Sequence, residues 1–274
     1  MTKQKLRIRT SHNKIVNQNN LHTSIQFSLD GFSFCIYDQE ELQNVTSYDF
    51  LESCSTPEEL LSRVKEVFEK DVNLHYPFQD ITVVHRNNLN TFVPNDFFSE
   101  EHIKNYFKYN IKTFATDYFT FDDIEVLNAK NAFIPFVNIN NYLLDHFGNF
   151  NFYHHQTILV KKLQKLVTDD TQVFVYFQNS LIDIVVFQSK EMTFINSFEI
   201  ESEKDFIYYL LFVLEQLQLN TEEVLVTLLG TITKESLFYK IAYTYVRNIK
   251  ILEGDNAFVQ KEEEFTPTEL FILT

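Results

Sequence analysis

Glycine is scarce in this chain, and its positions mark where the backbone could approach a ligand closely. The sequence contains 4 glycines among 274 residues. Loops that cradle phosphate need glycine, because without a side chain the backbone N–H groups can reach the ligand. The candidate binding residues are the dipeptides Asp30-Gly31 and Gly230-Thr231, in which glycine adjoins a side-chain oxygen. With so few glycines, few positions in the chain can form a phosphate-binding loop.

Each dipeptide also has a structural interpretation, which we favour. Asp-Gly is preferred in the type I′ turn of a two-residue hairpin, and Asp30-Gly31 lies between two stretches of alternating apolar residues. Gly230 follows an apolar stretch and precedes a helical pattern, so it suits a strand-to-helix turn.

The other reactive residue types form no recognisable catalytic or metal-binding pattern. His154 and His155 end an expected strand, where adjacent side chains point to opposite faces, one towards solvent and one towards the core. No Cys/His spacing resembles a zinc site. Cys54 lies beside Glu52, an acidic setting that disfavours a thiolate, and Cys35 is expected to pack as a small apolar side chain. We predict no catalytic residue and no metal site.

Nuclease chemistry is also disfavoured. It needs clustered carboxylates that hold two metal ions about 4 Å apart. The first expected strand offers only Asp30, at its end, and the expected strand 81–84 is Ile-Thr-Val-Val. The formal net charge of −15 opposes binding to a phosphate backbone. The basic residues of the first fourteen positions suit a solvated terminus better than an arm for nucleic acid or another anionic partner.

The elements that position these residues occur twice in the same order. Residues 24–49 carry three strand signals, followed by a capped amphipathic helix from Pro57 and an apolar strand from Asp80. Residues 171–199 again carry three strand signals, and a helix and an apolar strand follow. This duplicated order predicts an α/β chain of two similar domains.

The repeats also set the expected domain limits. We expect a polar tail at 1–21, a first domain at 22–168, a second domain at 169–252 and a C-terminal tail at 253–274. The stretch after the first apolar strand is longer than its counterpart in the second half, which predicts a subdomain inserted at about 92–137. The longest apolar run, Phe206 to Leu214, is shorter than the roughly 20 residues that cross a bilayer. With no apolar stretch after the basic start, we expect a cytoplasmic protein without membrane insertion.

Two βββαβα units in tandem, with an insertion after the fourth strand of the first, resemble the actin-like ATPase superfamily. Its members include actin, sugar kinases and heat-shock chaperones, and its domains have a ribonuclease H-like core. The stretch from Phe92 to Phe150 is most similar to the actin-like assembly protein of type IV pilus machines. The chain also resembles an uncharacterised bacterial domain family of that fold. The resemblance covers about residues 22–252 and rests on the order of the elements.

The resemblance implies where a nucleotide would bind. In that superfamily a hairpin in each domain combines an acid, a glycine and Thr or Ser to hold phosphates and magnesium-bound water, and a third, glycine-containing loop meets adenosine. The corresponding loops here are 29–33, 177–181 and 229–233. The first keeps an acid and one glycine, the second has neither, and the third keeps one glycine. A bound nucleotide would therefore contact Asp30, Gly31, Gly230 and Thr231.

The eroded second hairpin favours a role without nucleotide hydrolysis. We predict a non-catalytic scaffold or adaptor of actin-like architecture that needs no cofactor and acts through contacts with other proteins. Abundant aromatic residues, 29 Phe and 14 Tyr, suit interfaces where they are exposed. The alternative is an ATP-binding protein, ATPase or kinase that uses ATP and Mg in the interdomain cleft. The sequence does not identify the partner or the oligomeric state.

Overall fold

The computed structural model describes residues 6–12, 20–39, 41–254, 265–266 and 268–273. The chain divides into two compact units, Met1–Ile158 with Leu273–Thr274, and Leu159–Ile272. The division falls within helix α3 (His155–Leu163), whereas the predicted boundary lies after residue 168.

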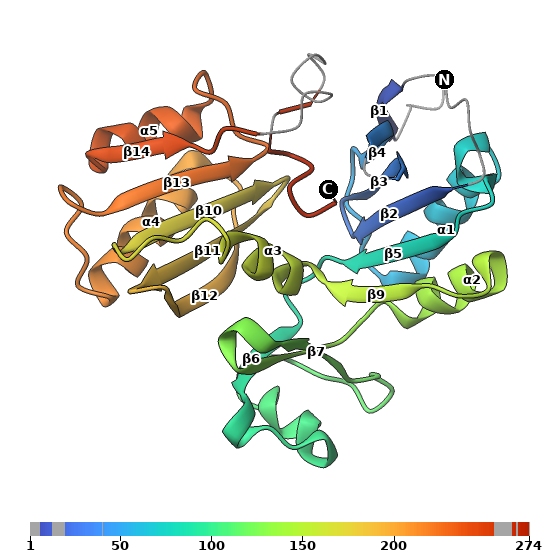
Figure 1. Ribbon diagram of the computed structural model, residues 1–274, viewed down its shortest axis with the longest axis horizontal. Helices are drawn as coiled ribbons and strands as arrows, with labels where there is room; N and C mark the ends of the chain where they lie inside the picture. The colour runs from blue at the N-terminus through green and yellow to red at the C-terminus, as the bar shows by residue number, and fades with distance from the viewer. Residues whose placement is uncertain (1–5, 13–19, 40, 255–264, 267, 274) are drawn as a thin grey trace. The chain divides into compact units, whose positions relative to one another are not determined.

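The first unit is built on a six-stranded sheet of order β1-β4-β3-β2-β5-β9 (Figure 1). Its strands are β1 (Leu6–His12), β2 (Leu21–Ser28), β3 (Gly31–Asp38), β4 (Glu41–Phe50), β5 (Asp80–His85) and β9 (Asn151–His154). The pairs among β1, β4, β3 and β2 are antiparallel, and β5 runs parallel to both β2 and β9. Helices α1 (Pro57–Phe68) and α2 (Val137–Phe147) belong to the same unit, with the 3-10 turn η1 (Val72–His75) after α1.

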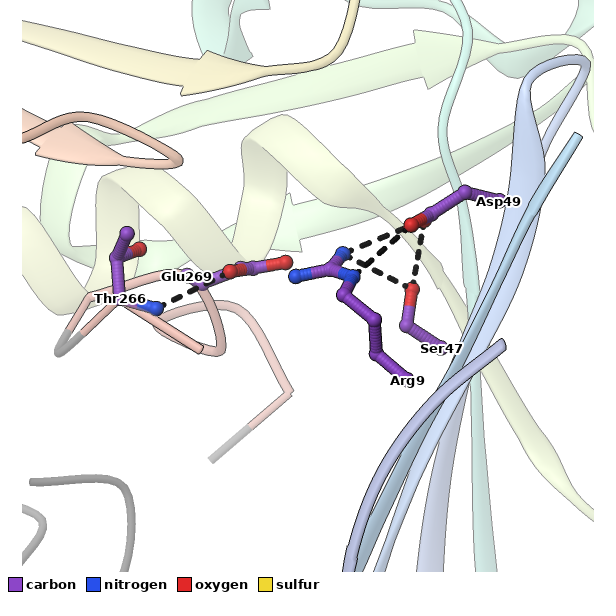
Figure 2. Close-up of polar contacts among 5 residues, drawn as sticks. All are labelled: Arg9, Ser47, Asp49, Thr266 and Glu269. Atoms are coloured by element: carbon purple, nitrogen blue, oxygen red, sulfur yellow. Dashed lines mark hydrogen bonds and ion pairs between the residues drawn. The ribbon is translucent and has the colours of Figure 1, made fainter. Parts of the chain in front are cut away.

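Strand β1 lies where a polar tail is expected from the sequence. It pairs with β4 along its whole length. Arg9 donates from Nε to the carboxylate of Asp49 at 2.9 Å and from Nη2 to the hydroxyl of Ser47 at 3.3 Å (Figure 2). Apolar Leu6 and Ile8 alternate with basic residues, so one face of the strand is apolar and the other is charged. The acidic partner on β4 explains why a basic segment joins this sheet.

Helix α1 begins where the sequence predicts. The Thr56 hydroxyl accepts the Glu59 N–H at 3.2 Å, and Pro57 occupies the first turn. The Glu59 carboxylate accepts the N–H of Ser55 at 2.9 Å, one residue before the position of a capping box. The predicted apolar stripe is buried in the core of the unit: Leu60, Val64, Val67 and Phe68.

A small subdomain is inserted between β5 and α2. Its three-stranded sheet has the order β6-β8-β7, with β6 (Asn90–Pro94), β7 (Thr120–Ile124) and β8 (Ala129–Phe133). The 3-10 segments η2 (Asn95–Phe97), η3 (Glu100–Tyr106) and η4 (Glu125–Leu127) connect its strands. Ile103, Phe107 and Ala132 are buried together in its own small core.

The second unit has a five-stranded sheet of order β12-β11-β10-β13-β14 (Figure 1). Its strands are β10 (Gln172–Gln178), β11 (Leu181–Gln188), β12 (Glu191–Glu199), β13 (Leu225–Gly230) and β14 (Asn248–Ile251), and its helices are α4 (Glu203–Gln216) and α5 (Leu237–Tyr245). Ser202 and Asp205 form a capping box at the start of α4. Among the described residues of both units, no helix is long and apolar enough to cross a membrane.

The two units repeat individual backbone hydrogen bonds as well as strand order. In the first unit the Phe50 N–H donates to the carbonyl of Asp30 at 2.8 Å. In the second the Ile200 N–H donates to the carbonyl of Ser180, also at 2.8 Å. Each bond joins the end of the third strand of its repeat to the hairpin between the first two. Repetition at this level fits the predicted duplication.

Candidate functional site

The first candidate pair, Asp30 and Gly31, lies at the hairpin between β2 and β3. The loop residues are Leu29 and Asp30, and neither has a positive φ. A type I′ turn requires positive φ at both, so the predicted turn type is not formed. Gly31 instead opens β3 with φ of +148°, and a Cβ there would lie 2.1 Å from the carbonyl oxygen of Tyr48. The close approach of β4 explains this glycine without any ligand.

The acid of this hairpin is bonded to the loop that follows β4. The Ser53 hydroxyl donates to the Asp30 carboxylate at 2.6 Å. The Cys54 N–H donates to the carbonyl of Leu29 at 2.7 Å. Burial raises the pKa of the Cys54 thiol to about 11, with Glu59 and Asp30 acting in the same direction and Arg63 against it. Burial, more than the acidic neighbours, therefore lowers the fraction of thiolate below that of an ordinary thiol.

The second hairpin has a conformation that suits a turn without glycine. Asn179 adopts φ of +53°, in the left-handed region that asparagine tolerates better than most residues. With Ser180 it forms the two-residue loop between β10 and β11. The hairpin thus keeps its shape, while the acid and the glycine of the superfamily pattern are missing.

The third loop contains the second candidate pair, Gly230 and Thr231, at the end of β13. A Cβ on Gly230, where φ is +93°, would lie 1.9 Å from the carbonyl oxygen of Phe177. The Gly230 N–H donates to the Thr268 hydroxyl at 2.8 Å, and its carbonyl accepts the Thr266 hydroxyl at 2.6 Å. The Thr231 N–H donates to the Phe177 carbonyl at 2.8 Å. Both backbone N–H groups of the pair are therefore engaged within the second unit.

The residues that engage Gly230 come from the C-terminal segment, by which we mean residues 265–266 and 268–272. Figure 2 shows the turn of this segment, in which the Thr266 N–H donates to the Glu269 carboxylate at 3.2 Å. The Tyr176 hydroxyl of β10 donates to the carbonyl of Glu269 at 3.3 Å. Leu270 and Ile272 are buried. These described residues of the predicted tail therefore pack onto the second unit.

Strand β11 carries a buried carboxylate that sequence reasoning missed. Asp183 is fully buried and accepts a hydrogen bond from the hydroxyl of Ser197 on β12. It lies opposite Tyr176 in the register of β10 and β11. The only signal is one acid inside an apolar strand. Over the residues the structure describes, no three His, Cys, Asp or Glu side chains come together to hold a metal ion.

Strand register places His85 of the first unit where the second has Gly230. Phe27 lies opposite His85 in one repeat, and Phe177 lies opposite Gly230 in the other. His85 is fully buried, and its burial lowers its pKa to about 4. Its Nε2 lies 2.8 Å from the Asn140 side-chain oxygen. The first repeat therefore has a neutral, hydrogen-bonded imidazole at this position, with no glycine loop.

The adjacent histidines His154 and His155 are both fully buried, so the predicted solvent-facing member is wrong. The Nε2 of His154 lies 3.1 Å from the carbonyl oxygen of Asn87, and its Nδ1 lies 3.1 Å from the Asn131 amide nitrogen. His155 begins α3 rather than ending β9. The change from strand to helix between the two residues explains why both side chains point inwards.

Comparison with known proteins identifies the fold and the family. No curated protein matches the chain in sequence. A Bacteroides thetaiotaomicron VPI-5482 protein with an actin-like ATPase fold and unknown function is similar, with a TM-score of 0.75, 23% identity, and coverage of 86% of this chain and 91% of that one. A chain of the PilM–PilN type IV pilus biogenesis complex is similar with a TM-score of 0.53 and 13% identity, covering 85% and 88%. These likenesses confirm the predicted actin-like ATPase fold.

Residues 10–249 match the family model described as Protein of unknown function (DUF3822). This range covers most of both units and agrees with the predicted resemblance to an uncharacterised family of this fold. The chain therefore belongs to the DUF3822 family and has an actin-like ATPase fold.

Proposed function

We propose that this protein is a non-catalytic adaptor that acts through contacts with other proteins. The observation that carries the proposal is the state of Gly230, whose N–H and carbonyl are bonded to the hydroxyls of Thr268 and Thr266. A loop that meets a nucleotide needs backbone groups that the ligand can reach. In this loop the backbone groups are instead bonded to the protein's own C-terminal segment.

The other two loops support the same conclusion. The Gly31 backbone packs against the Tyr48 carbonyl, and the Asp30 carboxylate is bonded to Ser53. The hairpin at Asn179 offers no carboxylate and no glycine. Electrostatic clamping of phosphate and magnesium needs such groups aimed at the ligand. Among the described residues, each glycine position of the superfamily pattern is therefore accounted for by packing or is missing.

A role in protein contacts is supported by the surface and by analogy. Tyr208 on α4 and Tyr243 on α5 are 62% and 64% exposed. Exposed aromatic side chains are favoured at interfaces, where one end is apolar and the other can hydrogen-bond. The similar PilM–PilN chain belongs to a biogenesis complex. Since a fold does not by itself set a function, this analogy supports the proposal without carrying it.

Titration with Mg-ATP tests the proposal against the alternative of an ATP-binding protein. Ligand at 100 times its dissociation constant stabilises a fold by about 2.7 kcal/mol, which a thermal shift detects. We expect no shift at millimolar Mg-ATP and no release of inorganic phosphate. The matched variant is Thr266→Val with Thr268→Val, which keeps the shape of the segment and removes both hydroxyls. A saturable shift with the wild-type chain would establish the alternative.

A further inference from the structure

The first unit contains an open groove between the β1–β4 edge of its sheet and helix α1. Its volume is about 890 Å³. We call it the β1 groove. The floor is formed by Leu6, Ile8, Thr10, Thr46, Tyr48 and Phe50 of β1 and β4. The wall is formed by α1, η1 and the turn between them, including Glu66, Val67, Lys70 and Val72. All of these residues belong to the first unit.

The groove exists because β1 widens the sheet beyond the strands that α1 covers. The core under α1 is formed by residues of β2, β3 and β4, such as Ile25, Phe34 and Tyr48. Neighbouring strands lie about 4.8 Å apart, so β1 extends the floor by about that width beyond β4, whose Tyr48 and Phe50 are buried. The second unit ends its sheet at β12, the counterpart of β4.

The floor combines apolar side chains with the polar Thr10 and Thr46, and several of its contacts are fixed. Ile8 is 57% exposed and Val72 is 73% exposed, on opposite sides of the groove. The Tyr48 hydroxyl donates to the Asp71 carboxylate at 2.5 Å. Burial raises the pKa of Tyr48, and the hydrogen bond and the charge of Asp71 raise it further. The guanidinium of Arg63 lies 4.9 Å from the centre of the Phe50 ring. Preformed apolar grooves with a few fixed polar groups are typical of binding sites.

The rim of the groove carries an excess of acid. Glu59 and Arg63 pair with each other at 2.5 Å, and Asp71 accepts the Tyr48 hydroxyl. Glu66 and Lys70 complete the charged residues of the wall. Three acids therefore face two bases, in a chain whose net charge is −15. A partner with a basic polar face would be steered towards this surface.

We propose that the β1 groove binds an amphipathic helix of a partner protein, with apolar residues at helical spacing towards Ile8, Tyr48 and Val72 and a basic polar face. This proposal deepens the adaptor function and rests on it. A helix fits better than an added strand, because the groove is lined by side chains of β1, β4, α1 and η1. Docking of one apolar helix face into such a groove is a common recognition mode.

The probe is a labelled synthetic peptide of Leu and Lys whose leucines follow helical spacing, measured by fluorescence anisotropy and by circular dichroism. We expect saturable binding with a gain of helical signal, and at least tenfold weaker binding of the matched Leu and Glu peptide. Ile8→Glu should weaken binding of the Lys peptide at least tenfold. The control is Val126→Glu, because Val126 is similarly exposed, at 60%, in the inserted subdomain.

The reversal Glu66→Lys separates charge recognition from folding, because it should weaken binding of the Lys peptide and strengthen binding of the Glu peptide. Equal binding of the Lys peptide to wild type and Ile8→Glu would overturn the proposal. So would binding without a helical signal, which would indicate an extended occupant. These outcomes leave the adaptor function standing if Mg-ATP still gives no thermal shift, whereas a shift with Mg-ATP overturns the adaptor function whatever the peptides do.

Discussion

Gly230 donates its backbone N–H to the hydroxyl of Thr268 at 2.8 Å, across 38 residues of sequence. The same hydroxyl lies 3.4 Å from the Gly230 carbonyl, which Thr266 approaches more closely, at 2.6 Å. Both backbone groups of this glycine are thus bonded to threonine side chains, and its carbonyl also accepts the N–H of Ile232 at 2.9 Å. A polar group buried without a partner costs free energy, so these threonines stabilise the loop.

Replacement of Thr268 by valine should destabilise the protein. The change removes the acceptor of the buried Gly230 N–H, and an unsatisfied buried group costs about 1–3 kcal/mol. Urea unfolding measures this loss. The matched control is Thr244→Val, since the Thr244 hydroxyl donates to the carbonyl of Lys240 on the exposed side of α5. A loss no larger than that of the control would contradict the structural role of Thr268.

Replacement of Gly31, Gly230 or Gly148 by alanine should destabilise the protein to different extents. A Cβ on Gly31 or Gly230 would lie within 2.1 Å or 1.9 Å of a backbone oxygen, which cannot move without displacing a strand. At Gly148 φ is +84°, but nothing lies within 4 Å of the added Cβ. Gly148→Ala should therefore cost only the strain of a positive φ in a sparsely populated backbone region, about 1–3 kcal/mol. Thermal unfolding of the three variants should rank Gly148→Ala as the mildest.

The buried His85 should make stability depend on pH in the acid range. Burial lowers its pKa from 6.5 to about 4, although the hydrogen bond with Asn140 acts in the opposite direction. Well above pH 6.5 the imidazole is neutral in both states, so its stabilising effect is fully present. As pH falls from about 6.5 towards 4, the unfolded chain takes up a proton that the folded chain does not. The free energy of unfolding should then fall by roughly 3 kcal/mol.

The contribution of His85 can be isolated by comparing how steeply the free energy of unfolding depends on pH in the wild type and in a variant. His85→Gln should flatten the dependence of unfolding free energy on pH between about 4 and 6.5, even if its stability at neutral pH is lower. His146, whose pKa burial also lowers, contributes in the same direction and remains in the variant. The same substitution at exposed His102 is the control. An unchanged slope in His85→Gln would show that the imidazole is not held neutral.

The two cysteines should resist thiol reagents in the folded protein. Cys35 and Cys54 are buried and form no disulfide bond, and burial raises the pKa of Cys54 to about 11. The thiolate is the reactive form, so little of it exists at pH 8. Ellman's reagent should react with both cysteines only after unfolding. Rapid reaction of one thiol in the native state would show that the loop after β4 opens readily.

The sequence predicts those parts of the fold that rest on local patterns. The alternation of Ile25 and Phe27 indicates β2, and Thr56 with Pro57 indicates the start of α1. The stripe of Leu60 and Val64 indicates which face of α1 is buried. These signals lie within one turn or one strand, so they need no knowledge of distant residues.

The features that the sequence hides depend on contacts between distant residues. Strand β1 forms because Arg9 meets Asp49, and a basic segment alone gives no sign of that partner. The role of Thr268 requires Gly230, which lies on another element. The reason for Gly31 is the carbonyl of Tyr48, contributed by the third strand of the repeat. Residue types therefore identify the positions of the candidate site, whereas tertiary packing decides what those positions do.

Strand β1 also bears on how the chain is trimmed for experiments. The family match begins at residue 10, in the middle of a strand that runs from Leu6 to His12. A polypeptide cut at the start of the match would lose Arg9 and leave part of β4 without its neighbour. An exposed edge strand can pair with strands of other molecules, so such a fragment would tend to aggregate. Retaining the residues from Leu6 onwards protects the sheet and keeps the groove floor complete.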